Sequence, residues 1–261
     1  IDILIFINYH INISNSRLMC SESRKTTVLI CALAIEAEPV LNNFTSIDRK
    51  SHKGIHIYRC EHKSTPIIVV VGGVGMEAAN KAALLTVGEF NPSKIVNFGF
   101  AGAVEPTLKI GQVVVVDSVG LYGKDSTPLK LATINSNLLN SPNISVGGKC
   151  LQVDRPFNSA DKKLAAKDGA VIVDMESWSI ANVALENGIS SLVVRAITDE
   201  IDCQLGQFMD KKNGFDWKDG VAKDQFLKHA LPAARNNAGV IRMMIDHWAT
   251  TEAMPDVGRE V

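Results

Sequence analysis

Aromatic residues and surplus charge are both scarce in this sequence of 261 residues. Phe, Trp and Tyr make up only 6% of the chain, and 27 Lys and Arg are balanced by 28 Asp and Glu. A protein that binds a nucleic-acid backbone shows a basic surplus, and a disordered acidic tail shows the opposite. The charge balance therefore argues against a polyanionic partner.

Paired cysteines and long apolar runs are also missing. The five cysteines are dispersed and form no Cys-x-x-Cys pair. Such a set argues against a disulfide framework and a structural zinc site, so we expect a reducing, cytoplasmic compartment. No apolar run reaches the roughly 18 to 20 residues of a membrane span. We expect a soluble protein with neither a membrane nor a nucleic-acid partner.

The ends of the chain differ in composition from its middle. The first 18 residues hold Ile clusters interrupted by Asn, without the basic region and cleavage site of a signal peptide. We interpret residues 1–26 as a disordered or spurious extension, with Met19 as the better start. Residues 27–249 are predicted to form a single domain, and residues 250–261 a polar tail.

In the middle of the chain, short β-branched runs alternate with Ala-rich amphipathic stretches. This alternation is typical of α/β proteins. Ile67–Val71 and Val113–Val116 are apolar at every position, which indicates strands buried on both faces and helices on both sides of the sheet. The sequence predicts a three-layer α/β/α sandwich, with helices over 76–89 and 177–187.

Two segments lack this pattern. Residues 121–146 are interpreted as a long surface loop or an insertion, and residues 46–65 as a polar hairpin. The hairpin contains His52, His56 and His62, but no carboxylate or thiolate pattern accompanies them. We therefore expect solvated histidines there and no metal site.

Polar residues gather where the predicted strands end. In open α/β sheets, ligands bind beyond the carboxyl ends of the strands. A single acid there is often only a helix N-cap, and this alternative applies to Asp174 and Glu176. The convergence of several groups favours a functional site instead. The groups are Glu36 and Glu38; Gly72, Gly73 and Gly75; Asp174, Met175 and Glu176; and Arg195 to Asp199.

The glycine cluster allows a rival interpretation as a dinucleotide-binding turn. Gly73-x-Gly75 followed by Ala78 is close to that fingerprint. The next strand should then end in an acid that binds a ribose, but it ends in Asn97, Phe98 and Gly99. A tight turn whose backbone N–H groups line a pocket fits better. No nucleophile elbow, Walker loop or His-Glu-x-x-His motif occurs either, and we expect no cofactor.

Four blocks of the chain resemble the nucleoside phosphorylase and nucleosidase superfamily, most clearly its hydrolytic branch of methylthioadenosine/S-adenosylhomocysteine nucleosidases. The resemblance extends over about residues 27 to 248 and implies a central mixed, mostly parallel sheet. Its most specific signal is the pair VDME and RAITD, in this order and spacing. The blocks are ICALAIEAEPVL, VVGGVGMEAANKAALL, IVNFGFAGAVEPTLKIGQVVVVD and VDMESWSIANVALENGISSLVVRAITDEID.

The resemblance implies a ribose site and a homodimer that completes its pocket across the subunit interface. Met175 and Glu176 match the family's ribose clamp, in which the carboxylate accepts hydrogen bonds from the 2' and 3' hydroxyls. Arg195 matches the basic residue that orders the acids. Gly73 is predicted to contribute to the substrate pocket.

The resemblance also implies an acid for the base and an acid for water. Glu36 matches the residue that positions the attacking water, and Thr198 with Asp199 matches the pair that faces purine N7, with Asp199 as the general acid. Cleavage of an N-glycosidic bond develops a cationic sugar and an anionic base, so it needs one acid that protonates the base and carboxylates that stabilise the sugar and activate water. Glu36, Glu176 and Asp199 supply that number.

Three positions depart from the family pattern. Phosphorylase relatives carry arginines that bind phosphate, but here Asn97 and the loop Ala34–Pro39 occupy those places, which favours water as the nucleophile. Phe100 stands where the hydrolases carry a small hydroxyl residue, so we expect a reshaped sugar pocket. Within Leu151–Phe157 we assign Val153 to the base pocket, with Leu151 and Phe157 as open alternatives.

The favoured function is a purine nucleosidase, acting on methylthioadenosine, adenosylhomocysteine or another modified purine nucleoside. The alternatives are a phosphorylase with unusual anion ligands, a catalytically silent nucleoside-binding protein of the same fold, and a dinucleotide-dependent enzyme. The joint presence of Glu36, Glu176 and Asp199 argues against the silent protein.

Overall fold

The computed structural model of the protein describes residues 26–124, 127–203 and 220–251. The predicted extension over 1–26 and tail over 250–261 lie outside these residues except at their inner ends. Residue 26 directly precedes the first strand, and residues 250–251 are the last residues of the final helix.

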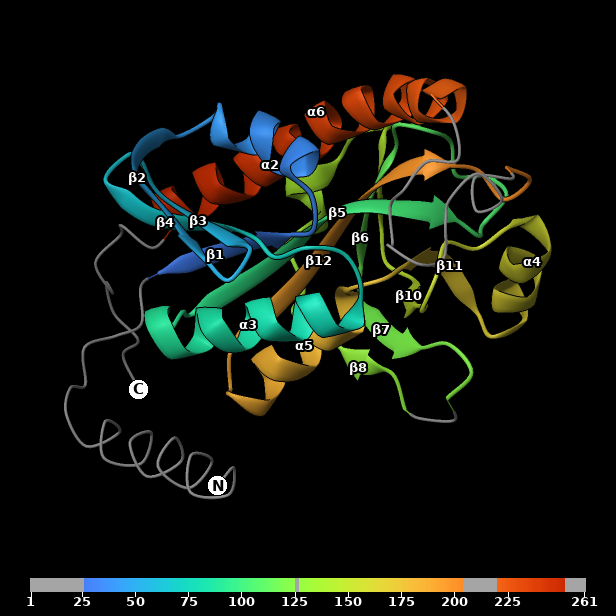
Figure 1. The fold of residues 1–261 in the computed structure, drawn as a ribbon, viewed down its shortest axis with the longest axis horizontal. Helices are drawn as coiled ribbons and strands as arrows, with labels where there is room; N and C mark the ends of the chain where they lie inside the picture. The colour runs from blue at the N-terminus through green and yellow to red at the C-terminus, as the bar shows by residue number, and fades with distance from the viewer. Residues whose placement is uncertain (1–25, 125–126, 204–219, 252–261) are drawn as a thin grey trace.

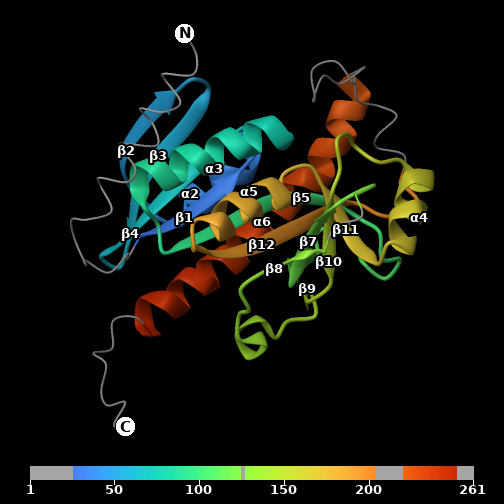
Figure 2. The same ribbon diagram turned by 90° about the horizontal axis from the view of Figure 1, so that it is seen from below.

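Parallel strands form the centre of the sheet (Figures 1 and 2). Strand β1 lies between β4 and β5, and β12 pairs with the other edge of β5. Because β1 and β4 are apolar at nearly every position, both faces of the sheet can be buried there, and β1 has no exposed residue. The strands are β1 (Thr27–Cys31), β4 (Thr65–Val71), β5 (Lys94–Ala103) and β12 (Ser190–Asp199).

The outer strands make the sheet mixed. The hairpin of β2 and β3 joins β4 in antiparallel fashion, β6 joins β12 antiparallel, and β11 joins the end of β5 antiparallel. The parallel pairs β11–β10 and β10–β7 extend the sheet further. These strands are β2 (Thr45–His52), β3 (Ile55–His62), β6 (Val113–Val116), β7 (Ser118–Leu121), β10 (Lys149–Gln152) and β11 (Ala170–Asp174).

Helices cover both faces of the sheet. Helix α3 packs beside α5 over one face, and α2 packs beside α6 over the other (Figure 1). Helix α4 lies at one end of the molecule beside β11. The predicted α/β/α sandwich is therefore confirmed. The helices are α2 (Ala34–Leu41), α3 (Met76–Phe90), α4 (Ser159–Lys167), α5 (Ser177–Glu186) and α6 (Gly220–Thr251).

Most predicted elements occupy their expected places. Helices α3 and α5 match the predicted 76–89 and 177–187 to within one residue at each end. The predicted hairpin is β2–β3, and it turns at Lys53 and Gly54, which both have positive φ. Such a pair suits a tight turn between antiparallel strands.

The prediction for residues 121–146 is wrong in part, because this segment contains short regular elements: the end of β7, β8 (Leu129–Lys130), a 3-10 helix (Ser136–Leu139) and β9 (Ile144–Val146). Strand β9 pairs with β6, and Leu139 is buried in the core. Elements of two to four residues are too short to show a hydrophobic period.

Helix α6 was not predicted. Its buried residues Ala230, Ala233, Ala234, Ala238 and Ile241 follow a helical spacing of three to four positions. This period was present in the sequence and would have revealed the helix.

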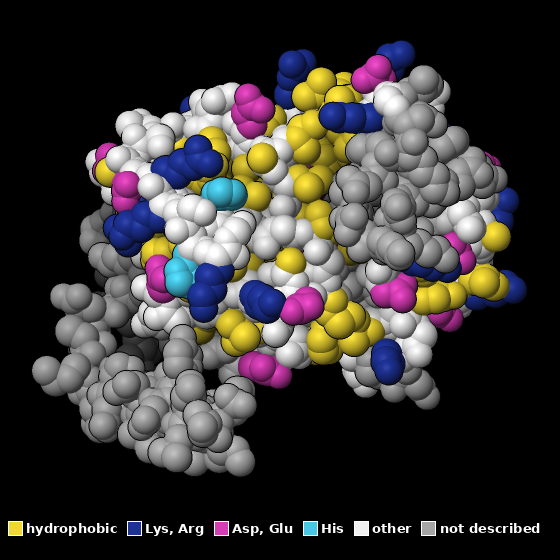
Figure 3. Space-filling model, viewed as in Figure 1, with side chains coloured by type: hydrophobic (Ala, Val, Ile, Leu, Met, Phe, Trp, Pro, Cys, Tyr) yellow, Lys and Arg dark blue, Asp and Glu magenta, His cyan; other side chains and the backbone are white. Residues whose placement is uncertain are grey.

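The surface agrees with the balanced composition. On the face shown in Figure 3, basic and acidic side chains are interspersed with apolar ones, without a broad area of one charge. None of the helices in the described part of the chain has the length and apolar character needed to cross a membrane.

Candidate active site

The candidate site lies where β5 changes its neighbour. On one edge β5 pairs with β1 as far as Asn97, and with β11 only from Gly102 onward. Such a switch point opens a crevice at the end of the parallel strands. A pocket occupies this place, and its lining includes Glu36, Phe100, Val153, Lys162, Glu176 and Asp199.

Glu36 enters the pocket from the first turn of α2. Its Oε2 accepts hydrogen bonds from the backbone N–H groups of Ala32 at 2.9 Å and Leu33 at 2.8 Å, and its Oε1 from Phe100 N at 2.9 Å. Burial raises the pKa of Glu36, while these N–H groups and Arg195 act in the opposite direction. The carboxyl group is thus held rigidly, and proton uptake is easier than for an exposed glutamate.

Two glycines let acidic side chains lie directly on β5. Gly99 has a φ of +152°, and a Cβ at this position would lie 2.6 Å from Glu36 Oε1. A Cβ on Gly102 would lie 2.9 Å from Asp199 Oδ2. Both approaches are closer than real side chains allow, so the two acids depend on these glycines.

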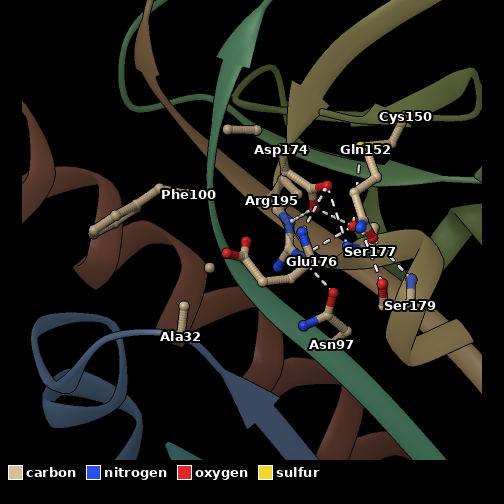
Figure 4. A network of polar contacts seen from close by, with 12 residues as sticks. Ala32, Asn97, Phe100, Cys150, Gln152, Asp174, Glu176, Ser177, Ser179 and Arg195 are labelled. Carbon is tan, nitrogen blue, oxygen red and sulfur yellow. Dashed lines mark hydrogen bonds and ion pairs between the residues drawn. The ribbon is translucent and has the colours of Figure 1, made fainter. Parts of the chain in front are cut away.

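Arg195 is the centre of a buried polar network beneath the pocket (Figure 4). Its Nε donates to Asp174 Oδ2 at 2.6 Å, and its Nη2 donates to Asn97 Oδ1 and to Ser177 Oγ at 3.0 Å. Asp174 Oδ1 in turn accepts from the backbone N–H of Ser177 at 3.2 Å and of Glu176 at 3.3 Å. Asp174 therefore accepts hydrogen bonds from the first N–H groups of α5, and Arg195 holds Asp174 in place.

Glu176 occupies the N-cap position of α5, but its side chain makes no capping hydrogen bond. Instead its Oε1 accepts from Gly75 N at 2.7 Å. Burial, followed by the charge of Asp174, raises the pKa of Glu176 to about 8, and Arg195 offsets part of this. A carboxyl group that is buried, perturbed and lines a pocket is typical of a functional site.

Asp199 lies beside a lysine that sequence analysis did not identify. Asp199 Oδ1 accepts from the Thr198 hydroxyl at 3.0 Å, and Oδ2 forms an ion pair with the Lys162 ammonium group. Lys162 Nζ also donates to the carbonyl oxygen of Glu200 at 2.8 Å. Lys162 comes from α4 and its side chain is only 1% exposed. The predicted acid is therefore a carboxylate paired with a buried cation.

Apolar side chains form the remaining walls. Val153 and Phe157 line the pocket, whereas Leu151 packs in the core between β10 and α4. Phe100 also lines the pocket and packs edge-on against Phe226 of α6, with ring centroids 5.9 Å apart. This aromatic pair narrows the pocket where the resemblance implied a small hydroxyl residue.

The turn after β4 lines the pocket with residues other than the predicted Gly73. Met175 lines the pocket, as does Val74, but Gly73 does not. Gly73 adopts a φ of +92° and its N–H donates to Ala32 O at 3.0 Å, which shapes the turn. The contribution of Gly73 to substrate binding stays a prediction, while the N–H of Gly75 supports Glu176, which lines the pocket.

The site offers poor binding for a phosphate dianion. Asn97, at the position of a phosphorylase arginine, is buried and bonded to Arg195 and to Ile30 O at 3.0 Å. The backbone N–H groups around Glu36 are taken by its own carboxylate. Within the described lining Lys162 is the only cation, and it is paired with Asp199.

In the described ranges, no group of three His, Cys, Asp or Glu side chains is placed to hold a metal ion. The hairpin histidines are less solvated than predicted, because His52 is exposed but His56 is half-buried. His62 is buried rather than solvated, stacks edge-on against Phe44 and contacts Asp246 Oδ1 of α6 at 2.8 Å.

Comparisons with known proteins agree with this geometry. The chain is 25% identical over 193 residues to the 5'-methylthioadenosine/S-adenosylhomocysteine nucleosidase of Staphylococcus haemolyticus, which covers 66% of this chain and 85% of that protein. The fold of this chain matches that of futalosine hydrolase of Helicobacter pylori with a TM-score of 0.71 and 19% identity, over 87% of this chain and 100% of that one.

A third similar protein has been solved with a ligand. The 5'-methylthioadenosine/S-adenosylhomocysteine nucleosidase of S. pneumoniae, bound to the transition-state inhibitor MT-ImmA, matches with a TM-score of 0.70 and 18% identity, over 84% of this chain and 98% of that one. The family model of the phosphorylase superfamily matches residues 26–245. The chain belongs to the phosphorylase superfamily.

Proposed function

We propose that the protein hydrolyses the N-glycosidic bond of a purine nucleoside and releases the free base. The observation that carries this proposal is that two buried acids from different elements, α2 and β12, lie against the same strand, β5. Glu36 rests on Gly99 and Asp199 on Gly102 of β5. Both acids line one pocket, and cleavage of a glycosidic bond by water needs one acid beside the leaving group and another beside the water.

The reaction divides among the three acids. The electron pair of the glycosidic C1'–N9 bond passes to the purine as the bond breaks, and N7 receives a proton from Asp199 that Lys162 supplies through their ion pair. Water attacks C1' and gives its proton to Glu36, and exchange with solvent then restores both groups. The Glu176 side chain accepts hydrogen bonds from the ribose hydroxyls, and in its ionised form it stabilises the positive charge of the sugar.

Hydrolysis fits the site better than phosphorolysis. A phosphate dianion needs paired guanidinium or free N–H donors. The backbone N–H groups beside Glu36, the acid that we assign to the attacking water, already donate to its carboxylate. A second carboxyl group, Glu176, lines the same pocket. A dianion placed there would meet two acids and no unpaired cation in the described lining.

A silent binding protein would not need this arrangement. Glu36 and Glu176 are both buried, and burial raises the pKa of each. Burying carboxyl groups in this way costs folding free energy. Retaining them in a pocket is explained by catalysis, in which groups that take up protons near neutral pH are required.

The substrate we propose is a 5'-modified purine nucleoside of the kind named for the similar proteins. Phe100 and Phe226 give the pocket an aromatic wall, which suits an apolar 5' substituent. We further propose that the enzyme is a homodimer and works in the cytoplasm. The buried thiols Cys31, Cys60 and Cys150 are consistent with a reducing compartment.

The proposal is tested by incubating the purified protein with a panel of purine nucleosides, with and without inorganic phosphate, and separating the products by chromatography. Free base and free sugar are expected at the same rate in both buffers. The exposed variant Asp202→Asn serves as a matched control, since Asp202 lies near Asp199 in sequence but outside the pocket lining. Absence of base release from every nucleoside would contradict the proposed function.

A further inference from the structure

Lys162 gives the base side of the pocket a positive charge. Its side chain is 1% exposed, yet it lines the pocket together with Thr198 and Asp199. The neighbouring side chain on α4, Lys163, is 61% exposed. A lysine is almost never fully buried unless it is paired, so the direction of Lys162 into the pocket needs an explanation.

The ammonium group keeps one hydrogen for a ligand. A lysine has three N–H donors. One reaches the Glu200 carbonyl oxygen at 2.8 Å and one the Asp199 carboxylate, while the third has only a long contact of 3.5 Å with Asp199 O. Each oxygen of the Asp199 carboxylate already accepts a hydrogen bond, from Lys162 or from Thr198. At the ammonium group, what is offered to a purine is therefore a donor.

Purines differ in the hydrogen-bonding groups along the edge that carries N7 and the substituent on C6. A 6-aminopurine shows an acceptor at N7 and a donor at its amino group, whereas a 6-oxopurine shows acceptors at both N7 and O6. Next to an ammonium group, the amino donor would leave two buried donors facing each other, which is unfavourable. The O6 acceptor would complete the hydrogen bonds of the ammonium group.

We propose that the base pocket selects purines with an oxygen on C6, and that Lys162 determines this specificity by donating a hydrogen bond to O6. The proposal rests on the proposed function, since it assumes that the pocket holds the purine of a nucleoside. The same positive charge stabilises the purine anion that forms when the glycosidic bond breaks. A site built to hydrogen-bond one substituent rejects analogues that lack it.

The test compares nucleosides that share a sugar and differ only at C6. We expect kcat/KM to be about 10- to 100-fold higher for 5'-methylthioinosine than for 5'-methylthioadenosine, and for inosine than for adenosine. The variant Lys162→Met keeps the length of the side chain and removes the charge, so it should lower this ratio at least about tenfold. The matched control Lys163→Met should leave the ratio unchanged. A loss of activity with an unchanged ratio in Lys162→Met would indicate a structural role and overturn the proposal.

The wild-type protein gives an independent answer if Lys162→Met does not fold. Calorimetry with hypoxanthine and adenine should show tighter binding of hypoxanthine. Equal or tighter binding of adenine, or a higher kcat/KM for the adenine nucleosides, would overturn the specificity while leaving hydrolysis intact. If no nucleoside is hydrolysed, the proposed function fails, and the two free bases still decide the preference of the pocket.

Discussion

Burial of Glu176 should make the stability of the protein depend on pH in a way that one substitution can isolate. The pKa of Glu176 is raised from 4.5 to about 8, chiefly by burial. A carboxyl group whose pKa is raised in the folded state binds its proton more tightly there than in the unfolded chain. Its contribution to stability is therefore complete below pH 4.5 and is lost as the pH rises toward about 8.

The magnitude follows from the size of the shift. Each unit corresponds to about 1.4 kcal/mol, so the free energy of unfolding should fall by several kcal/mol across this range as Glu176 loses its proton. Glu176→Gln preserves the shape and the acceptor for Gly75 N but carries no charge. The variant should match the wild type near pH 4.5 and exceed its free energy of unfolding by several kcal/mol at pH 9.

Urea unfolding followed by tryptophan fluorescence between pH 4.5 and pH 9 measures this difference. The control is Glu38→Gln, because Glu38 is exposed on the same helix as Glu36 and has no burial cost to relieve. A stability difference between Glu176→Gln and wild type that stays constant with pH, or grows toward low pH, would refute the reasoning that burial dominates at this carboxyl group.

Three further predictions concern the support of the site and the assembly. Gly99→Ala should displace the Glu36 carboxylate and lower kcat at least about tenfold. The control Gly88→Ala changes a helical position with open space around it, so it should retain activity and gain up to about 1 kcal/mol of stability. Equal kcat in both variants would contradict this prediction. Asp199→Asn leaves the buried Lys162 ammonium unpaired and should lower the free energy of unfolding by about 3 to 5 kcal/mol. The double variant with Lys162→Met should recover most of this loss but not activity, and a single variant as stable as the wild type would mean that the ion pair does not form. Sedimentation at micromolar concentration should show a dimer, and a 28.2 kDa species alone would contradict the proposed assembly.

The sequence was informative about the site wherever a strand end carried its own signal. Glu36 and Asp199 follow β1 and β12, which run parallel to β5, and because carboxyl ends of parallel strands meet at one edge, the convergence of these two acids was predictable. Glu176 follows β11, which runs antiparallel to β5, so its place beside them was visible only in three dimensions. The glycines of β5 were visible as letters, but their purpose was not, since the contacts of Gly99 and Gly102 with acids join distant parts of the chain.

Lys162 could not be predicted because it breaks the local pattern of its helix. In α4 the apolar Leu164 is 49% exposed, while the charged Lys162 is buried with Ala165. Hydrophobic periodicity would direct the leucine inward and the lysine outward. Local rules of this kind fail most often at functional sites, where another requirement outweighs packing. The pairing of Lys162 with Asp199 was therefore visible only in three dimensions.

In the proposed reaction, Asp199, a buried acid on β12, drives phosphate-independent cleavage of a glycosidic bond. Single-turnover base release in phosphate-free buffer, compared between wild type, Asp199→Asn and the exposed control Asp202→Asn, tests it most directly. We expect base release by wild type and control, and a loss of about 10²- to 10⁴-fold in Asp199→Asn with substrate still bound. Release that requires phosphate and yields a sugar 1-phosphate, or a normal rate in Asp199→Asn, would contradict it.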